Sequence, residues 1–246
     1  MKLPIALQLY SVRDETEKDM LGTLKKVAGM GYTGVEFAGF GGIPAGRMKA
    51  ELAALGLKPI ANHTGIKLLK ERLGEEIEYN LEVGIKYIIC PFNSYESKED
   101  YLKTAAFLNE TGEKCKASGL QLGYHNHAFE FTAYDGEYGL DILYRETSPG
   151  NLVAEIDSGW VFFAGVDPAE YILKYKGRCP LVHVKDFLTR GERTFTEIGN
   201  GIIDMKAIIR AAEAAGTEWL IVEQDVSSRT SLESAKICID NLSKLL

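Results

Sequence analysis

All four histidines of the chain stand at the ends of short apolar segments that have the pattern of β-strands. They are His63, His125, His127 and His183. A neutral imidazole is a common metal ligand, and histidine is also the side chain that most readily carries a proton near neutral pH. A single histidine at a strand end is usually a satisfied polar residue, but four of four at such positions indicate one functional site.

Two carboxylates accompany these histidines at the ends of successive strands. Asp157, His183 and Glu223 end three strands that follow one another along the chain. A mixed set of oxygen and nitrogen ligands with open coordination positions suits Mn²⁺, Zn²⁺, Co²⁺ or Mg²⁺. We therefore expect these residues to bind one divalent metal ion.

Further side chains at the strand ends are candidates for substrate contacts and proton transfer. Tyr10, Glu36 and His63 are expected to bind substrate, and Trp160 offers a flat apolar wall for the CH face of a sugar ring. Lys185 is a candidate acid or base, with a structural ion pair to its neighbour Asp186 as the alternative. The other candidate acids and bases are His63, His125, His127 and Glu223.

The elements that must hold these residues alternate between strand and helix patterns. Short apolar segments separate longer segments of helical period, and glycines such as Gly31, Gly56 and Gly216 follow several of the helices. The predicted strands span residues 4–9, 33–37, 57–61, 87–91, 121–124, 152–156, 181–184 and 219–222. The clearest predicted helices span residues 20–30, 47–55, 101–118, 205–215 and 231–245.

About eight strand-then-helix units in 246 residues predict an α/β fold, the closed (β/α)8 or TIM barrel, built as a single domain from residues 1–246. Continuous apolar strands joined by helices are typical of a parallel sheet that is covered on both faces. An open doubly wound sheet would usually carry a glycine-rich phosphate loop after its first strand, whereas this chain has Gln8-Leu9-Tyr10-Ser11-Val12-Arg13. Because barrel active sites lie at the C-terminal ends of the strands, the polar strand-end residues should meet there.

Composition excludes several classes of protein. Hydrophobic residues make up 46% of the chain and charged residues 26%, which are globular rather than disordered or fibrous values. Lys and Arg number 28 and Asp and Glu 35, and the resulting net charge of −7 argues against a nucleic-acid partner. No apolar run reaches the roughly 18–20 residues that a membrane span requires. We expect a cytoplasmic protein with four reduced cysteines and no membrane partner, a removed signal peptide being the alternative.

Several motifs together resemble the xylose isomerase-like TIM-barrel superfamily. They are Asp157-Ser158-Gly159-Trp160, Asp167-Pro168, His183-Val184-Lys185-Asp186 and Glu223-Gln224-Asp225. The resemblance covers essentially the whole chain, and the sugar phosphate isomerase/epimerase group is the most similar part of the superfamily. The segment His125-Asn126-His127-Ala128-Phe129-Glu130-Phe131 resembles one branch of that group. The relatives include inosose dehydratases and ketose epimerases.

The resemblance implies a metal site with four ligands, namely a Glu on the fifth strand, an Asp on the sixth, a His on the seventh and a Glu on the eighth. The last three correspond to Asp157, His183 and Glu223. At the end of the fifth strand, where relatives such as ketose epimerases have Glu, this chain departs from the pattern and reads Tyr124-His125-Asn126-His127. Glu130 is the expected fourth ligand because a third carboxylate better offsets a divalent charge, and His125 is the alternative.

The resemblance also implies a reaction. A divalent ion would chelate two neighbouring oxygens of a keto sugar or polyol and stabilise the enediolate formed when a base removes the proton α to the carbonyl. Return of the proton gives an epimer or an isomer, and expulsion of a β-oxygen gives dehydration or glycoside cleavage. The expected function is a metal-dependent sugar isomerase or epimerase. A lyase is the alternative, because the fifth-strand Glu is missing and the pair His125 and His127 resembles the His-Pro-His segment of inosose dehydratases.

Two other functions fit this sequence less well. Endonuclease IV shares the barrel, but its three-zinc cluster needs more ligands than four histidines readily supply. A non-catalytic sugar-binding barrel would not need the Asp, His and Glu set. The loop Gly199-Asn200-Gly201 precedes a helix opened by Asp204 and is as consistent with a turn as with a phosphate cradle. We therefore expect a small carbohydrate without a phosphate group as substrate, and the family resemblance implies a possible homo-oligomer.

Overall fold

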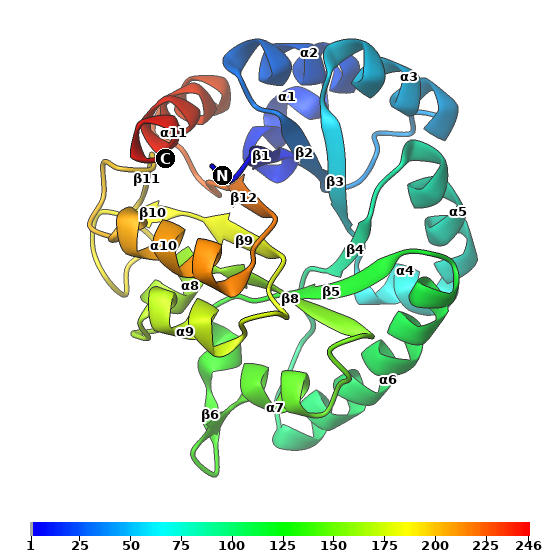
Figure 1. The fold of residues 1–246 in the computed structure, drawn as a ribbon, viewed down its shortest axis with the longest axis vertical. Coiled ribbons are helices and arrows are strands. Elements are labelled where there is room, and N and C mark those ends of the chain that lie inside the picture. Colours follow the sequence, from blue (N-terminus) through cyan, green and yellow to red (C-terminus); the bar gives the residue numbers. More distant parts are fainter. Residues whose placement is uncertain (1) are drawn as a thin grey trace.

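The computed structural model describes residues 2–246. In this part of the chain, eight parallel strands close into a barrel in the order β1-β12-β9-β8-β5-β4-β3-β2, and helices surround it (Figure 1). The strands are β1 (Ile5–Gln8), β2 (Gly34–Phe37), β3 (Lys58–His63), β4 (Tyr87–Cys90), β5 (Gln121–His125), β8 (Leu152–Asp157), β9 (Leu181–Val184) and β12 (Trp219–Val222). The predicted (β/α)8 barrel is confirmed.

The helices lie on the outside of the barrel and connect its strands. They are α1 (Arg13–Thr16), α2 (Met20–Met30), α3 (Ala45–Leu55), α4 (Ile66–Glu71), α5 (Leu73–Val83), α6 (Lys98–Ala117), α7 (Gly139–Arg145), α8 (Ser158–Phe163), α9 (Pro168–Lys174), α10 (Met205–Ala215) and α11 (Ser231–Leu245). None of the helices in residues 2–246 is both long and apolar enough to span a membrane. The predicted bounds of α2, α10 and α11 are confirmed.

Short elements occur in the loops at the C-terminal ends of the strands. Two 3-10 helices, η1 (Leu9–Val12) and η2 (Phe129–Phe131), follow β1 and β5. The hairpins β6 (Ala133–Tyr134) with β7 (Glu137–Tyr138) and β10 (Asp186–Phe187) with β11 (Phe195–Thr196) follow β5 and β9. These loops build the walls around the barrel mouth.

Side-chain alternation along the strands places the polar site above a layer of apolar side chains inside the barrel. A small cluster of buried apolar residues includes Ala6, Val153, Leu181 and Ile221. Successive side chains point to opposite faces of a strand, so the residue two positions further on points into the barrel as well. That position is Glu155 in β8, and the corresponding positions are Gln8 in β1, His183 in β9 and Glu223 directly after β12. The polar residues therefore form the next layer of the barrel interior. A larger apolar cluster fills the space between the strands and the helices.

Candidate metal centre and active site

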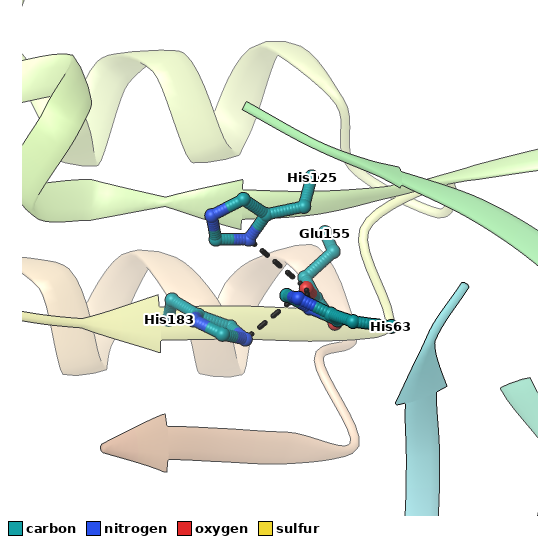
Figure 2. A group of neighbouring side chains, drawn as sticks. All are labelled: His63, His125, Glu155 and His183. Carbon is teal, nitrogen blue, oxygen red and sulfur yellow. Dashed lines mark hydrogen bonds and ion pairs between the residues drawn. The ribbon is translucent and has the colours of Figure 1, made fainter. Parts of the chain in front are cut away.

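Three imidazoles converge on one carboxylate inside the barrel (Figure 2). Oε1 of Glu155 lies 2.9 Å from Nε2 of His63, 3.0 Å from Nδ1 of His125 and 3.1 Å from Nε2 of His183. We call these four residues the inner histidine group. Glu155 is fully buried and was not among the residues that the sequence analysis selected. Its signal was a charged residue in an apolar strand, two positions before Asp157 and on the same face.

A second set of potential ligands lies nearer to the barrel mouth, and we call it the outer metal group. It consists of His125, Asp157, His183 and Glu223, whose ligand atoms all lie within 4.8 Å of one another. Nδ1 of His183 lies 2.9 Å from Oε2 of Glu223, and Nε2 of His125 lies 3.7 Å from Oδ2 of Asp157. The structure thus brings Asp157, His183 and Glu223 together, as the sequence analysis expected.

The two groups share His125 and His183 but use opposite nitrogens of each ring. A neutral imidazole offers one lone pair, because its other nitrogen carries the proton. A single ion can therefore use both imidazoles in one group at a time. The outer metal group supplies two carboxylates as well, and His125 and Glu223 line a cavity open to solvent. This donor set fits a divalent metal ion that also has to reach a substrate.

Glu130, the expected fourth ligand, lies outside both groups, whereas His125, the alternative, belongs to both. Its Oε1 accepts a hydrogen bond of 2.9 Å from the Tyr124 hydroxyl, and its Oε2 accepts one of 2.8 Å from the backbone N–H of His127. The side chain is fully buried. The turn of η2 folds this carboxylate back onto β5, and burial raises its pKa to about 8.

Lys185 is buried among three carboxylates, two of which belong to the outer metal group. Its Nζ lies 2.9 Å from Oδ2 of Asp157, 2.9 Å from Oε2 of Glu223 and 3.0 Å from Oδ2 of Asp225. An ion pair with Asp186, the structural alternative for Lys185, is not formed. Asp186 instead accepts hydrogen bonds from the backbone N–H groups of residues 187, 199, 201 and 203.

The Gly199-Asn200-Gly201 loop is therefore occupied by a carboxylate from within the chain. Oδ2 of Asp186 accepts from the N–H of Gly199 at 2.9 Å and from that of Gly201 at 3.0 Å. Those N–H groups would be the ones to bind a phosphate, and an ionised Asp186 would repel it. Asp204 caps α10 through the N–H of Ala207, as the sequence analysis expected.

Glu36, an expected substrate contact, lies beneath the site and is not among the residues that line the cavity. Its Oε2 lies 2.6 Å from Nε2 of His183 and accepts a hydrogen bond of 2.8 Å from Nε2 of Gln8. The side chain is fully buried. The next carboxylate of the same layer, Glu155, shares the His183 nitrogen with it.

A cavity of about 640 Å³ opens above the outer metal group. Of the predicted substrate contacts, Tyr10, His63 and Trp160 line it, together with the candidate acid or base His127. Trp160 Nε1 and His127 Nδ1 are buried and have no hydrogen-bond partner among residues 2–246. The sequence analysis did not predict the remaining walls, which come from segments that follow the strands: Arg13, Ala38, Pro91, Phe92, Arg193, Phe195, Asp225 and Val226.

The charges of the site differ between its two sides. Burial and the neighbouring imidazoles lower the pKa of His125 well below its ordinary value, and burial lowers the pKa of His127 to about 4. Although burial acts to raise it, the Lys185 ammonium holds the pKa of Glu223 well below its ordinary value. At neutral pH, two neutral imidazoles from β5 and the loop after it therefore face an ionised carboxylate that follows β12.

Comparisons with known proteins agree with this architecture. An inosose dehydratase from Geobacillus kaustophilus is 26% identical, and the match covers 91% of this chain and 86% of that protein. Further inosose dehydratases match over 45% to 68% of their own length. A sugar phosphate isomerase/epimerase from Parabacteroides distasonis superposes with a TM-score of 0.87 at 26% identity, over 98% of both chains.

A structure described as the IolI protein with a bound zinc atom shares the fold. Its TM-score is 0.77 at 16% identity, and the match covers 100% of this chain and 99% of that chain. The model of the xylose isomerase-like TIM barrel family matches residues 24–242, which is most of the barrel. The chain therefore belongs to the xylose isomerase-like TIM barrel family.

Proposed function

We propose that this protein is a metal-dependent enzyme that removes the proton α to the carbonyl of a keto sugar or keto polyol and then expels a β-oxygen, acting as a lyase. The observation that carries the proposal is the outer metal group at the floor of the cavity. His125, Asp157, His183 and Glu223 would hold a divalent ion, which would supply Lewis-acid chemistry toward neighbouring oxygens of the substrate. The inosose dehydratase relatives support a dehydration.

The residues of this chain then perform the proton transfers. Glu223 is ionised and lines the cavity, so its carboxylate can take the α-proton while the C–H electron pair forms a carbon–carbon double bond. The β C–O bond breaks with its electron pair going to the oxygen, and the leaving oxygen takes a proton from solvent water in the open cavity and departs as water or as an alcohol. His127 lines the cavity from the segment after β5, where its Nδ1 has no partner in residues 2–246. In the N–H form this nitrogen hydrogen-bonds the leaving oxygen.

Elimination is favoured over epimerisation by the placement of Glu130. Ketose epimerases of the family typically use two carboxylates on opposite faces of the substrate. The Glu130 carboxylate is held by Tyr124 and the backbone of His127, outside the cavity lining. On that side of the cavity the side chains are the imidazoles of His125 and His127, whose pKa values are lowered. A neutral imidazole is a poor reservoir for the proton that an epimerase must return to the opposite face.

The second candidate is a sugar isomerase or epimerase. It is favoured by Asp225, whose carboxylate lines the cavity close to Glu223 and shares the Lys185 ammonium with it. A second carboxylate next to the first can return the proton to a neighbouring carbon. The likeness to the isomerase/epimerase from Parabacteroides distasonis supports this reading.

A labelling experiment distinguishes the two functions. The Mn²⁺-loaded protein is incubated in D₂O with a panel of ketoses, inosose and 3-keto-glucosides, and each mixture is followed by NMR. An unsaturated product or a released alcohol supports the lyase. Deuterium in a recovered or epimerised ketose, without loss of water or alcohol, supports the isomerase or epimerase. Absence of exchange with every substrate, in a protein that binds metal, contradicts the proposed substrate class.

A further inference from the structure

Both imidazoles of the outer metal group turn their second nitrogen toward the same buried carboxylate. Nδ1 of His125 and Nε2 of His183 lie 3.0 Å and 3.1 Å from Oε1 of Glu155. Their other nitrogens face the carboxylates of Asp157 and Glu223. Figure 2 shows Glu155 lying between the two rings, at the centre of the inner histidine group.

This arrangement decides which nitrogen of each ring carries the proton. A ring nitrogen beside a carboxylate oxygen is stabilised as an N–H donor, which leaves the lone pair on the opposite nitrogen. Metal-ligating histidines commonly donate their second N–H to a carboxylate, and this contact fixes the tautomer and the ring orientation. One oxygen of Glu155 meets this requirement for His125 and His183 together.

We propose that Glu155 is a positioning residue that holds His125 as the Nδ1–H tautomer and His183 as the Nε2–H tautomer, so that His125 Nε2 and His183 Nδ1 point their lone pairs at the metal. This inference rests on the proposed function, since it places the ion in the outer metal group. Glu155 is fully buried and does not line the cavity, so it acts through the imidazoles and not on the substrate.

Glu36 completes the support on one side. Its Oε2 lies 2.6 Å from Nε2 of His183 and also accepts the amide N–H of Gln8. His183 thus has two acceptors for its proton, whereas His125 has Glu155 as its near acceptor. Loss of the Glu155 carboxylate should therefore disturb His125 more than His183.

The opposite arrangement is an ion bound in the inner histidine group. It would take the lone pairs of His125 Nδ1 and His183 Nε2, and the protons would move to the nitrogens that face Asp157 and Glu223. The two arrangements differ in the protonated nitrogen of each ring, which ¹⁵N NMR of the diamagnetic Zn²⁺-loaded protein reports directly. We expect His125 Nδ1–H and His183 Nε2–H. The reverse pair of tautomers overturns the inference even if no variant folds.

The matched variants are E155Q and E197Q. Glu197 is another buried glutamate, and its Oε1 accepts a hydrogen bond of 2.9 Å from the Ser234 hydroxyl in α11. We expect E155Q to bind one Zn²⁺, Mn²⁺ or Co²⁺ per chain with an affinity lower by roughly 10- to 100-fold, the range typical of such outer partners. The visible spectrum of bound Co²⁺ should also change. E197Q should keep the wild-type affinity and spectrum.

The outcomes separate this inference from the proposed function. If wild type and E155Q bind the ion with equal affinity and the same Co²⁺ spectrum, Glu155 does not position the ligands, while the metal site stands. If E155Q binds no ion at all, Glu155 is itself a ligand and the inference is wrong. If the wild-type protein binds none of the three ions, the proposed function fails and this inference fails with it.

Discussion

The ammonium group of Lys185 lies 2.9 Å from Oδ2 of Asp157, with both side chains buried in the barrel mouth. The same ammonium lies 2.9 Å from Glu223. A permanent cation thus shares both carboxylates of the outer metal group with the divalent ion that we propose. Without the ion, Lys185 reduces the repulsion between these carboxylates. When the ion is bound, the Lys185 ammonium repels it.

We predict that K185M lowers the free energy of unfolding of the metal-free protein and raises its affinity for Mn²⁺. Removal of one partner from a buried ion pair costs about 3–5 kcal/mol, because the carboxylates of Asp157, Glu223 and Asp225 lose their counter-charge. The same change removes a repulsion on the divalent ion. Urea unfolding without metal and Mn²⁺ titration against a chelator measure the two effects. Unchanged or weaker Mn²⁺ binding in a folded variant would contradict the prediction.

Two single substitutions, H125A and E130Q, test whether His125 or Glu130 is the fourth ligand. H125A removes a ligand of the outer metal group. Its affinity for Mn²⁺ should therefore fall by more than the roughly 10- to 100-fold that follows from loss of a residue that only hydrogen-bonds to a ligand. E130Q should keep the affinity, since Glu130 bonds to Tyr124 and to the backbone of His127. Metal analysis after dialysis gives the result. The reverse order of the two variants would restore Glu130 as the ligand.

How far the sequence predicts the site depends on the part of the fold that holds each residue. Asp157, His183 and Glu223 were found because strand alternation and barrel closure dictate where they point. Glu155 lies inside the predicted strand 152–156, on the same face as Asp157, but a residue within the strand was not expected to share the site of the strand ends. The predicted strands 57–61 and 121–124 stop just before His63 and His125, which β3 and β5 include.

Residues on the loops could not be placed in this way. The direction of the Glu130 side chain depends on the single turn of η2. That turn is held by the hydrogen bond that the Glu130 carboxylate accepts from the backbone N–H of His127. The arginines of the cavity, Arg13 and Arg193, come from segments without a strand pattern. Loop conformation follows from tertiary contacts far apart in sequence, such as the bond between Arg13 and the Asp225 carbonyl.

The buried Glu130 should make stability depend on pH. Burial raises its pKa from 4.5 to about 8, so the folded state holds a proton that the unfolded state releases above 4.5. The stability that the protonated group contributes is present in full below pH 4.5 and is lost as the pH rises toward 8. The slope is at most about 1.4 kcal/mol per pH unit in this window. E130Q should therefore gain stability over wild type from pH 5 to pH 8 in urea unfolding. A constant difference between the two proteins across this range would refute the prediction.

The anchoring of the 199–203 loop by Asp186 is tested by a glycine pair. A Cβ on Gly201 would lie 2.1 Å from Oδ1 of Asp186 and 2.4 Å from the carbonyl oxygen of Phe187, so G201A must displace the loop. We expect a loss of about 1–3 kcal/mol in urea unfolding. G29A is the control, because a Cβ there meets nothing within 4 Å inside α2, and it should gain about 0.5–1 kcal/mol. Equal stabilities of G201A and wild type would mean that the Asp186 contacts do not hold this loop, and its N–H groups would then be free to bind an anion.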